Sequence, residues 1–172
     1  MTIEAFNHTI DHWIKELERY DLSRLCLQPS PGSWSPGQLY RHLIDDTRYY
    51  IEQIRICIAT NDNAEEEASG TARIMFSNNE FPDEIIQGAP GNAFIPQPGN
   101  KEELLRDLQD VKNEMNTVAL AMTTSPFKGK TKHPGLHYFN AAEWLQLADM
   151  HFRHHLRQKK RIDHFLEHTG NL

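Results

Sequence analysis

Four segments of this sequence carry apolar residues at alternating steps of three and four, the spacing that places them on one face of an α-helix. They cover residues 3–20, 36–60, 100–122 and 140–165. Because each helix must bury its apolar face, four such helices predict an all-α fold, a four-helix bundle. The 172 residues fit one domain, so we expect residues 1–172 to form a single bundle.

Two of these segments have well-marked start signals. Ser35 is followed by Pro36 and Gln38, the order expected of a helix cap, a first helical residue and a capping-box partner. Asn140 and Glu143 stand in the same relation at the start of the last segment. We therefore expect helices to begin directly after Ser35 and Asn140.

A connection of about forty residues, 61–100, separates the second helix from the third. It is rich in Gly, Pro and Asn, and we predict a short helix within it at residues 64–76. Loops of this length are uncommon in compact domains unless they cross a bundle or cover a site. The connection predicts a crossover between two helices that run in the same direction. Its helix-breaking prolines are Pro82, Pro90, Pro96 and Pro98.

Composition excludes several classes of partner. The net charge is −6 and the basic residues are scattered, so we expect no nucleic acid as the main partner. No apolar run approaches the length of a membrane span, and we see no secretory signal, so we expect no membrane association. Cys26 and Cys57 match no disulfide framework and are interpreted as reduced thiols of a cytoplasmic protein.

Histidine is frequent, with ten residues, and two of them lie on the inward face of the last helix. His151, His155 and Gln158 continue the apolar seam that Trp144 and Ala148 begin. Burying an imidazole without a partner costs about 1–3 kcal/mol, as for other unsatisfied polar groups. Residues four apart on a helix lie one above the other, so the HxxxH spacing directs both imidazoles at one point, where they could bind a metal ion.

A metal bound by this pair needs a ligand from a neighbouring helix, and His42 is the candidate. It lies between Leu39 and Leu43, on the side of the second helix expected to face the core. Three neutral imidazoles would hold a divalent ion with vacant positions for water or substrate, and both zinc and nickel suit such ligands. Asp46, one turn after His42, could orient a ligand or bind a metal-bound water.

The alternative is that the HxxxH spacing arose by chance in a histidine-rich chain, because helical histidines are commonly solvated. His154 is adjacent to His155 but points toward a flank, and we interpret it as a surface residue or one that supports the ligands. Arg153 and Arg157 flank the histidines and could hold a substrate carboxylate, although solvated arginines are the commoner case in helices. The remaining histidines are predicted to be solvated in helices (His8, His12, His164, His168) or to lie in the loop before the last helix (His133, His137).

Two segments resemble motifs of the DinB-like family. The second helix of that family follows a Trp-Ser turn and carries one metal-binding histidine, which is similar to SWSPGQLYRHLID at residues 33–45. The last helix carries an HxxxH pair followed by Gln, which is similar to HPGLHYFNAAEWLQLADMHFRHHLRQKKRI at residues 133–162. The resemblance implies a four-helix bundle of DinB-like type with a long crossover between helices 2 and 3. It also implies metal ligands at His42, His151 and His155.

The resemblance does not single out one reaction. The subgroup that the chain looks closest to includes metal-dependent hydrolases and S-transferases that use a low-molecular-weight thiol of the bacillithiol type. Both would act on a small-molecule substrate at a metal with an open position. A non-catalytic alternative is a metal-binding or stress-related bundle that binds a small molecule or a protein. Resemblance also makes a homodimer compatible with the chain.

Overall fold

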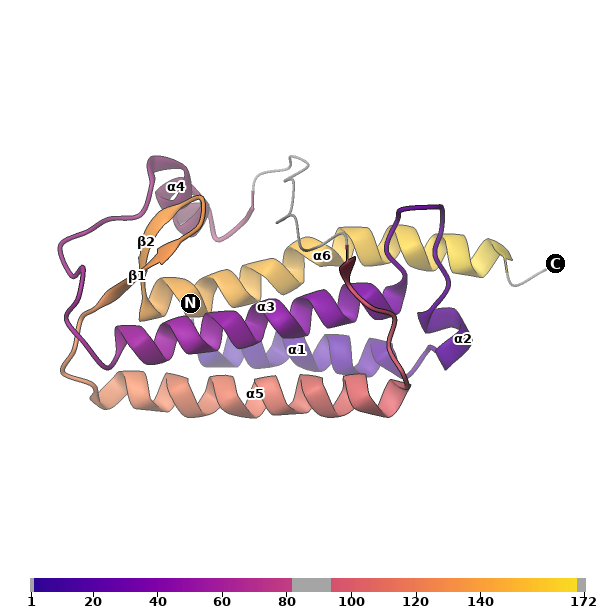
Figure 1. Ribbon diagram of the computed structural model, residues 1–172, viewed down its shortest axis with the longest axis horizontal. Helices are drawn as coiled ribbons and strands as arrows, with labels where there is room; N and C mark the ends of the chain where they lie inside the picture. The colour runs from indigo at the N-terminus through magenta and orange to yellow at the C-terminus, as the bar shows by residue number, and fades with distance from the viewer. Residues whose placement is uncertain (1, 82–93, 170–172) are drawn as a thin grey trace.

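A computed structural model describes residues 2–81 and 94–169 of the chain (Figure 1). Four long helices lie side by side and form a bundle, which confirms the predicted all-α architecture. They are α1 (Ile3–Leu17), α3 (Pro36–Cys57), α5 (Lys101–Thr124) and α6 (Ala141–Thr169). Shorter elements complete the fold, namely α2 (Leu22–Leu25), α4 (Gly70–Asn78), β1 (Lys130–His133) and β2 (His137–Asn140).

The directions of the long helices follow from their cross-helix contacts. Thr9 of α1 bonds Asp149 of α6, and Tyr20, just beyond α1, bonds Asp163 further along α6, so α1 and α6 run in parallel. On α3 and α5, Arg41 pairs with Glu103 and Arg55 pairs with Glu114, so these two helices also run in parallel. The long connection between α3 and α5 is therefore the predicted crossover. Pro82 and Pro90 of that connection lie outside the described residues.

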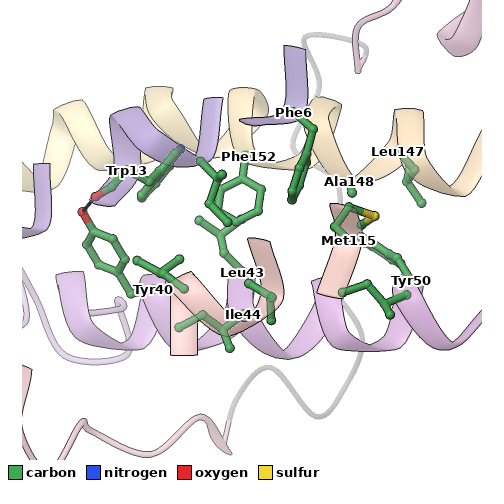
Figure 2. Close-up of a cluster of buried hydrophobic side chains, with 14 of the residues drawn as sticks. Phe6, Trp13, Tyr40, Leu43, Ile44, Tyr50, Met115, Leu147, Ala148 and Phe152 are labelled. Carbon is green, nitrogen blue, oxygen red and sulfur yellow. Dashed lines mark hydrogen bonds between the residues drawn. The ribbon is translucent and has the colours of Figure 1, made fainter. Parts of the chain in front are cut away.

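The core consists of large side chains that the helices direct inward (Figure 2). Phe6 and Trp13 of α1 pack edge-to-face on Phe152 of α6, with ring centroids 6.0 and 5.9 Å apart. Tyr40 of α3 packs on Trp13 at 5.2 Å and donates its hydroxyl hydrogen to the Trp13 carbonyl. Aromatic pairs of this kind contribute beyond their buried area, so α1, α3 and α6 are firmly fixed relative to one another.

Several helix boundaries differ from the sequence prediction, and the last helix extends to Thr169, four residues beyond its predicted end. The first helix ends at Leu17 rather than Tyr20, because Asp21 caps the separate short helix α2. The second helix ends at Cys57, three residues before the predicted end. The predicted helix at residues 64–76 is instead α4 at Gly70–Asn78, because Ser69 caps it and accepts a bond from the Ala72 amide.

The segment before α6 forms a β-hairpin, which corrects the prediction of a loop containing His133 and His137. β1 and β2 pair antiparallel, with Thr131 opposite Phe139. Phe139 is fully buried, and the Trp144 indole donates to the Thr131 hydroxyl at 2.7 Å. The hairpin thus covers the first turn of α6 at the end of the bundle where α4 also lies (Figure 1).

No helix in residues 2–81 or 94–169 combines the length and the apolar character that crossing a bilayer requires.

Candidate metal centre

Three histidines meet between α3 and α6. His42 comes from α3, and His151 and His155 come from successive turns of α6. Their Nε2 atoms lie 3.1 Å apart for His42 and His151, 3.2 Å for His42 and His155, and 3.0 Å for His151 and His155. We call these three residues the three-histidine centre. The structure therefore brings together all three residues that the sequence predicted as ligands.

Local sequence signals explain why the two helices present these histidines. In α3, the Ser35 hydroxyl accepts from the Gln38 amide and the Gln38 side chain accepts from the Ser35 amide, so the predicted capping box is formed. In α6, Asn140 and Glu143 bond each other's amides in the same way, at 2.8 and 3.0 Å. Each cap fixes the start of its helix and hence which residues face inward.

The hydrogen bonds of the imidazoles indicate where their lone pairs point. The Nδ1 atom of His155 lies 2.9 Å from the Gln158 amide oxygen, which can only accept, so Nδ1 carries the proton and Nε2 carries a lone pair. The Nδ1 atom of His42 faces the Asp46 carboxylate at 3.7 Å, which favours the same tautomer. The Nδ1 atom of His151 is buried and has no hydrogen-bond partner among the described residues.

Lone pairs that converge at 3.0–3.2 Å repel one another unless a cation or a proton lies between them. Nitrogen atoms at these separations can each lie about 2.1 Å from one common point, the usual distance to a zinc ion. The donor set of three neutral imidazoles also suits a divalent metal. The residues present therefore fit a divalent ion.

Burial keeps the three imidazoles neutral. It lowers the pKa of His42 to about 4 and, together with the nearby His42, lowers the pKa of His155 to about 3. The pKa of His151 is well below its usual value because the residue is buried and because the other histidines adjoin it. Since a metal binds only the neutral form, the centre is ready for binding at neutral pH without losing protons.

Asp46 lies beside the centre, as the sequence predicted. Its Oδ2 atom is 3.8 Å from Nε2 of His151, and the Tyr50 hydroxyl donates to the same oxygen at 3.4 Å. Burial raises the pKa of Asp46 to about 6, against the opposing effect of the Tyr50 hydrogen bond. A carboxyl group with a pKa near 6 can both accept and release a proton at neutral pH.

Aromatic rings surround the three-histidine centre, and sequence reasoning missed two of them as site residues. Trp34 covers His42 with ring centroids 4.8 Å apart, and Phe81 lies 6.3 Å from His151. Tyr50 of α3 packs against His151 with ring centroids 5.9 Å apart. Trp34 belongs to the Trp-Ser turn before α3 and so had a sequence signal, whereas nothing in the pattern around Phe81 indicates its position.

The other residues considered at the sequence level have different surroundings. His154 is half-buried between Phe81 and His155, at 5.1 and 5.2 Å, which agrees with a residue behind the ligands. Arg153 is not simply solvated, because it pairs with the buried Asp149 at 2.7 Å. The four histidines predicted to be solvated are exposed, namely His8, His12, His164 and His168.

Comparisons with known proteins agree with this fold. A solved structure described as the crystal structure of TT2238, a four-helix bundle protein, superimposes with a TM-score of 0.54 at 18% sequence identity. The match covers 92% of this chain and 93% of that one, and it supports the four-helix-bundle fold. A search of curated proteins gave no match. The family profile of the DinB superfamily matches residues 5–158, most of the chain, and so the chain belongs to the DinB superfamily.

Proposed function

We propose that this protein is a divalent-metal-dependent enzyme that acts on a small molecule at the three-histidine centre. The observation that carries the proposal is the convergence of three imidazole Nε2 atoms within 3.2 Å of one another. Three protein ligands leave further positions of a divalent ion open, which is the arrangement of catalytic rather than structural sites. Zinc and nickel both suit the donor set.

A bound divalent ion would supply a Lewis acid that polarises the substrate and lowers the pKa of water or of a thiol at an open position. Among the residues that the structure describes, Asp46 is best placed to take up the proton that such a nucleophile loses. Its carboxylate lies 3.8 Å from the ligand nitrogen Nε2 of His151 and 3.7 Å from Nδ1 of His42, and its raised pKa keeps it able to accept and then pass on that proton. The Tyr50 hydroxyl orients the carboxylate through Oδ2.

Two reactions fit these residues. In hydrolysis, Asp46 accepts a proton from water as the new bond to the substrate forms, and the proton then goes to the leaving group. In thiol S-transfer, Asp46 accepts the thiol proton, the sulfur forms the new bond and the leaving group departs with its electron pair. Both reactions need the same ligands and the same proton acceptor, so the residues do not distinguish between them. An experiment must decide whether the nucleophile is water or a thiol.

The first experiment measures metal content in protein purified without chelator and without a nickel-affinity step. We expect close to one zinc or nickel ion per chain, and loss of that ion in His42→Ala. His12→Ala is the matched control, because His12 is an exposed helical histidine of α1 and its loss should leave metal content unchanged. Equal metal content in wild type and His42→Ala would contradict the ligand assignment.

The second experiment identifies the nucleophile. Metal-loaded protein is assayed with ester and amide substrates in water, and with an electrophile such as a chlorodinitrobenzene in the presence and absence of a low-molecular-weight thiol. Turnover that requires the thiol supports S-transfer, and turnover of esters or amides without it supports hydrolysis. Asp46→Asn should lower kcat about 10²–10⁴-fold with metal retained, which is the range for loss of a general base.

A further inference from the structure

A groove of about 240 Å³ lies between α4 and α6, close to the three-histidine centre. Its apolar lining comes from Ile74 and Met75 of α4 and from Phe81 just beyond that helix. Its polar lining comes from Thr71, Asn78 and Glu80 and, on α6, from Arg157. Ile74 is 65% exposed, so a large aliphatic side chain faces this groove without cover from the described part of the chain. Apolar grooves beside polar reactive groups are typical of small-molecule sites.

Phe81 connects this groove with the three-histidine centre. It lines the groove, and its ring also packs near His151 and His154, with centroid distances of 6.3 and 5.1 Å. The same ring therefore lies beside both the groove and the three-histidine centre.

Hydrogen bonds from α6 hold this wall in place. The Gln146 amide donates to the Phe76 carbonyl, and the Arg153 guanidinium donates to the Asn79 carbonyl, both at 2.9 Å. Arg153 is itself fixed by Asp149, which is 2% exposed. Asn79 has a left-handed backbone with φ of 54°, which ends α4 and turns the chain toward Phe81. These bonds fix the position of α4 and Phe81 relative to α6.

We infer that the groove between α4 and α6 binds an apolar group of the molecule whose reacting end lies at the three-histidine centre. This inference rests on the proposed function and adds a substrate class to it, namely molecules with a polar, metal-binding end joined to an aliphatic or aromatic group. Ile74, Met75 and Phe81 provide apolar contact for that group, so affinity should rise with the apolar area that they cover.

The test uses a series of linear hydroxamates from acetohydroxamate to octanohydroxamate, added to zinc-loaded protein and followed by isothermal titration calorimetry. The hydroxamate group binds zinc at the open positions, and only the alkyl chain varies. We expect the dissociation constant to fall by about fourfold for each methylene group that becomes buried. A dissociation constant that does not change with chain length would overturn the inference.

Ile74→Ala tests the location of the groove, with Leu120→Ala as the matched control. Both residues are exposed aliphatic side chains, 65% and 71% exposed, but Leu120 lies on α5 and not in the groove. We expect Ile74→Ala to weaken octanohydroxamate binding by about threefold or more and to leave acetohydroxamate binding unchanged. An equal effect of the two substitutions would place the alkyl chain elsewhere and overturn the inference.

The two proposals fail in different ways. If acetohydroxamate binds zinc-loaded protein but longer chains bring no gain, the metal centre stands and the groove assignment falls. If the protein binds no zinc, the proposed function falls, and this inference falls with it.

Discussion

At the residue scale, Gln158 decides which nitrogen of His155 carries the proton. Its amide oxygen accepts from Nδ1 at 2.9 Å and so turns the Nε2 lone pair toward the other two histidines. Sequence reasoning noted Gln158 as an inward residue after the HxxxH pair, because it follows the same helical register. Its hydrogen bond explains why a polar residue occupies that inward position.

Removing this hydrogen bond should weaken metal binding without unfolding the protein. We expect Gln158→Ala to reduce metal affinity by about 10–100-fold, the usual effect of losing a residue that orients a ligand. Competition with a chromophoric chelator measures the change. Gln109→Ala is the control, because Gln109 is an exposed glutamine of α5. Unaltered affinity in Gln158→Ala would show that His155 needs no help in presenting Nε2.

The pKa values of the histidines in the three-histidine centre predict how the stability of the metal-free protein depends on pH. In the folded chain the pKa of His42 is about 4 and that of His155 about 3, while unfolded histidine titrates near 6.5. Between about pH 6.5 and pH 4 the unfolded chain therefore binds protons that the folded chain does not. The free energy of unfolding should fall as the pH is lowered through this window.

Asp46 acts in the opposite direction, because its pKa in the folded state is raised to about 6. Between about pH 6 and pH 4 the folded carboxyl group binds a proton that the unfolded one does not, which adds stability as the pH falls. Since three imidazoles oppose one carboxyl group, thermal unfolding in EDTA should show a lower midpoint at pH 5 than at pH 7. Asp46→Asn should make this fall steeper; an unchanged or smaller fall would contradict the assignment.

At the scale of elements, α6 is held against α1 by a buried lysine, Lys159, one turn after His155. Lys159 is 4% exposed and donates to Glu16 at 2.9 Å and to Asp163 at 2.7 Å. The Tyr20 ring lies 5.2 Å from its ammonium group, and the Tyr20 hydroxyl bonds Asp163. Ionic groups in a helix interface cost solvation energy, so the interaction depends on every partner being present.

Lys159→Met should therefore destabilise the fold by about 3 kcal/mol, because it leaves two largely buried carboxylates without their shared cation. Urea denaturation followed by circular dichroism measures this change. Lys112→Met is the matched control, since Lys112 pairs with the exposed Asp11 across α5 and α1. That loss should cost less than about 1 kcal/mol. Similar costs for the two substitutions would mean that burial adds nothing to the Lys159 interaction.

Elements with local signals could be predicted from the sequence, whereas elements that depend on distant partners could not. Ser35 and Asn140 form the caps that the sequence indicated, and their helices present His42 and His151 inward as expected. The β-hairpin was missed because its strands are only four residues long, too short for alternation to be recognised. Phe81 could not be assigned to the site because its position depends on bonds from α6 to α4.

At the scale of the whole molecule, the three-histidine centre joins α3 to α6, two antiparallel helices that are distant in sequence. The residues that meet there are separated by 109 positions for His42 and His151 and by 113 for His42 and His155. An ion bound by all three can exist only while both helices are folded and packed. Metal binding must therefore stabilise the whole bundle. The gain in the free energy of unfolding grows with the logarithm of the ratio between the free metal concentration and the dissociation constant of the metal.

This linkage has a measurable size. At a free metal concentration of about 1,000 times the dissociation constant, the gain is about 4 kcal/mol. For a chain of this length, each kcal/mol raises the melting temperature by about 2–4 °C, so the expected rise is about 8–16 °C. Scanning calorimetry of EDTA-treated protein, before and after addition of zinc or nickel, measures it. His155→Ala should abolish the rise and His12→Ala should retain it, because only His155 belongs to the centre. A rise that persists in His155→Ala would mean that the metal stabilises the chain from another position, since two imidazoles alone bind too weakly to link the helices.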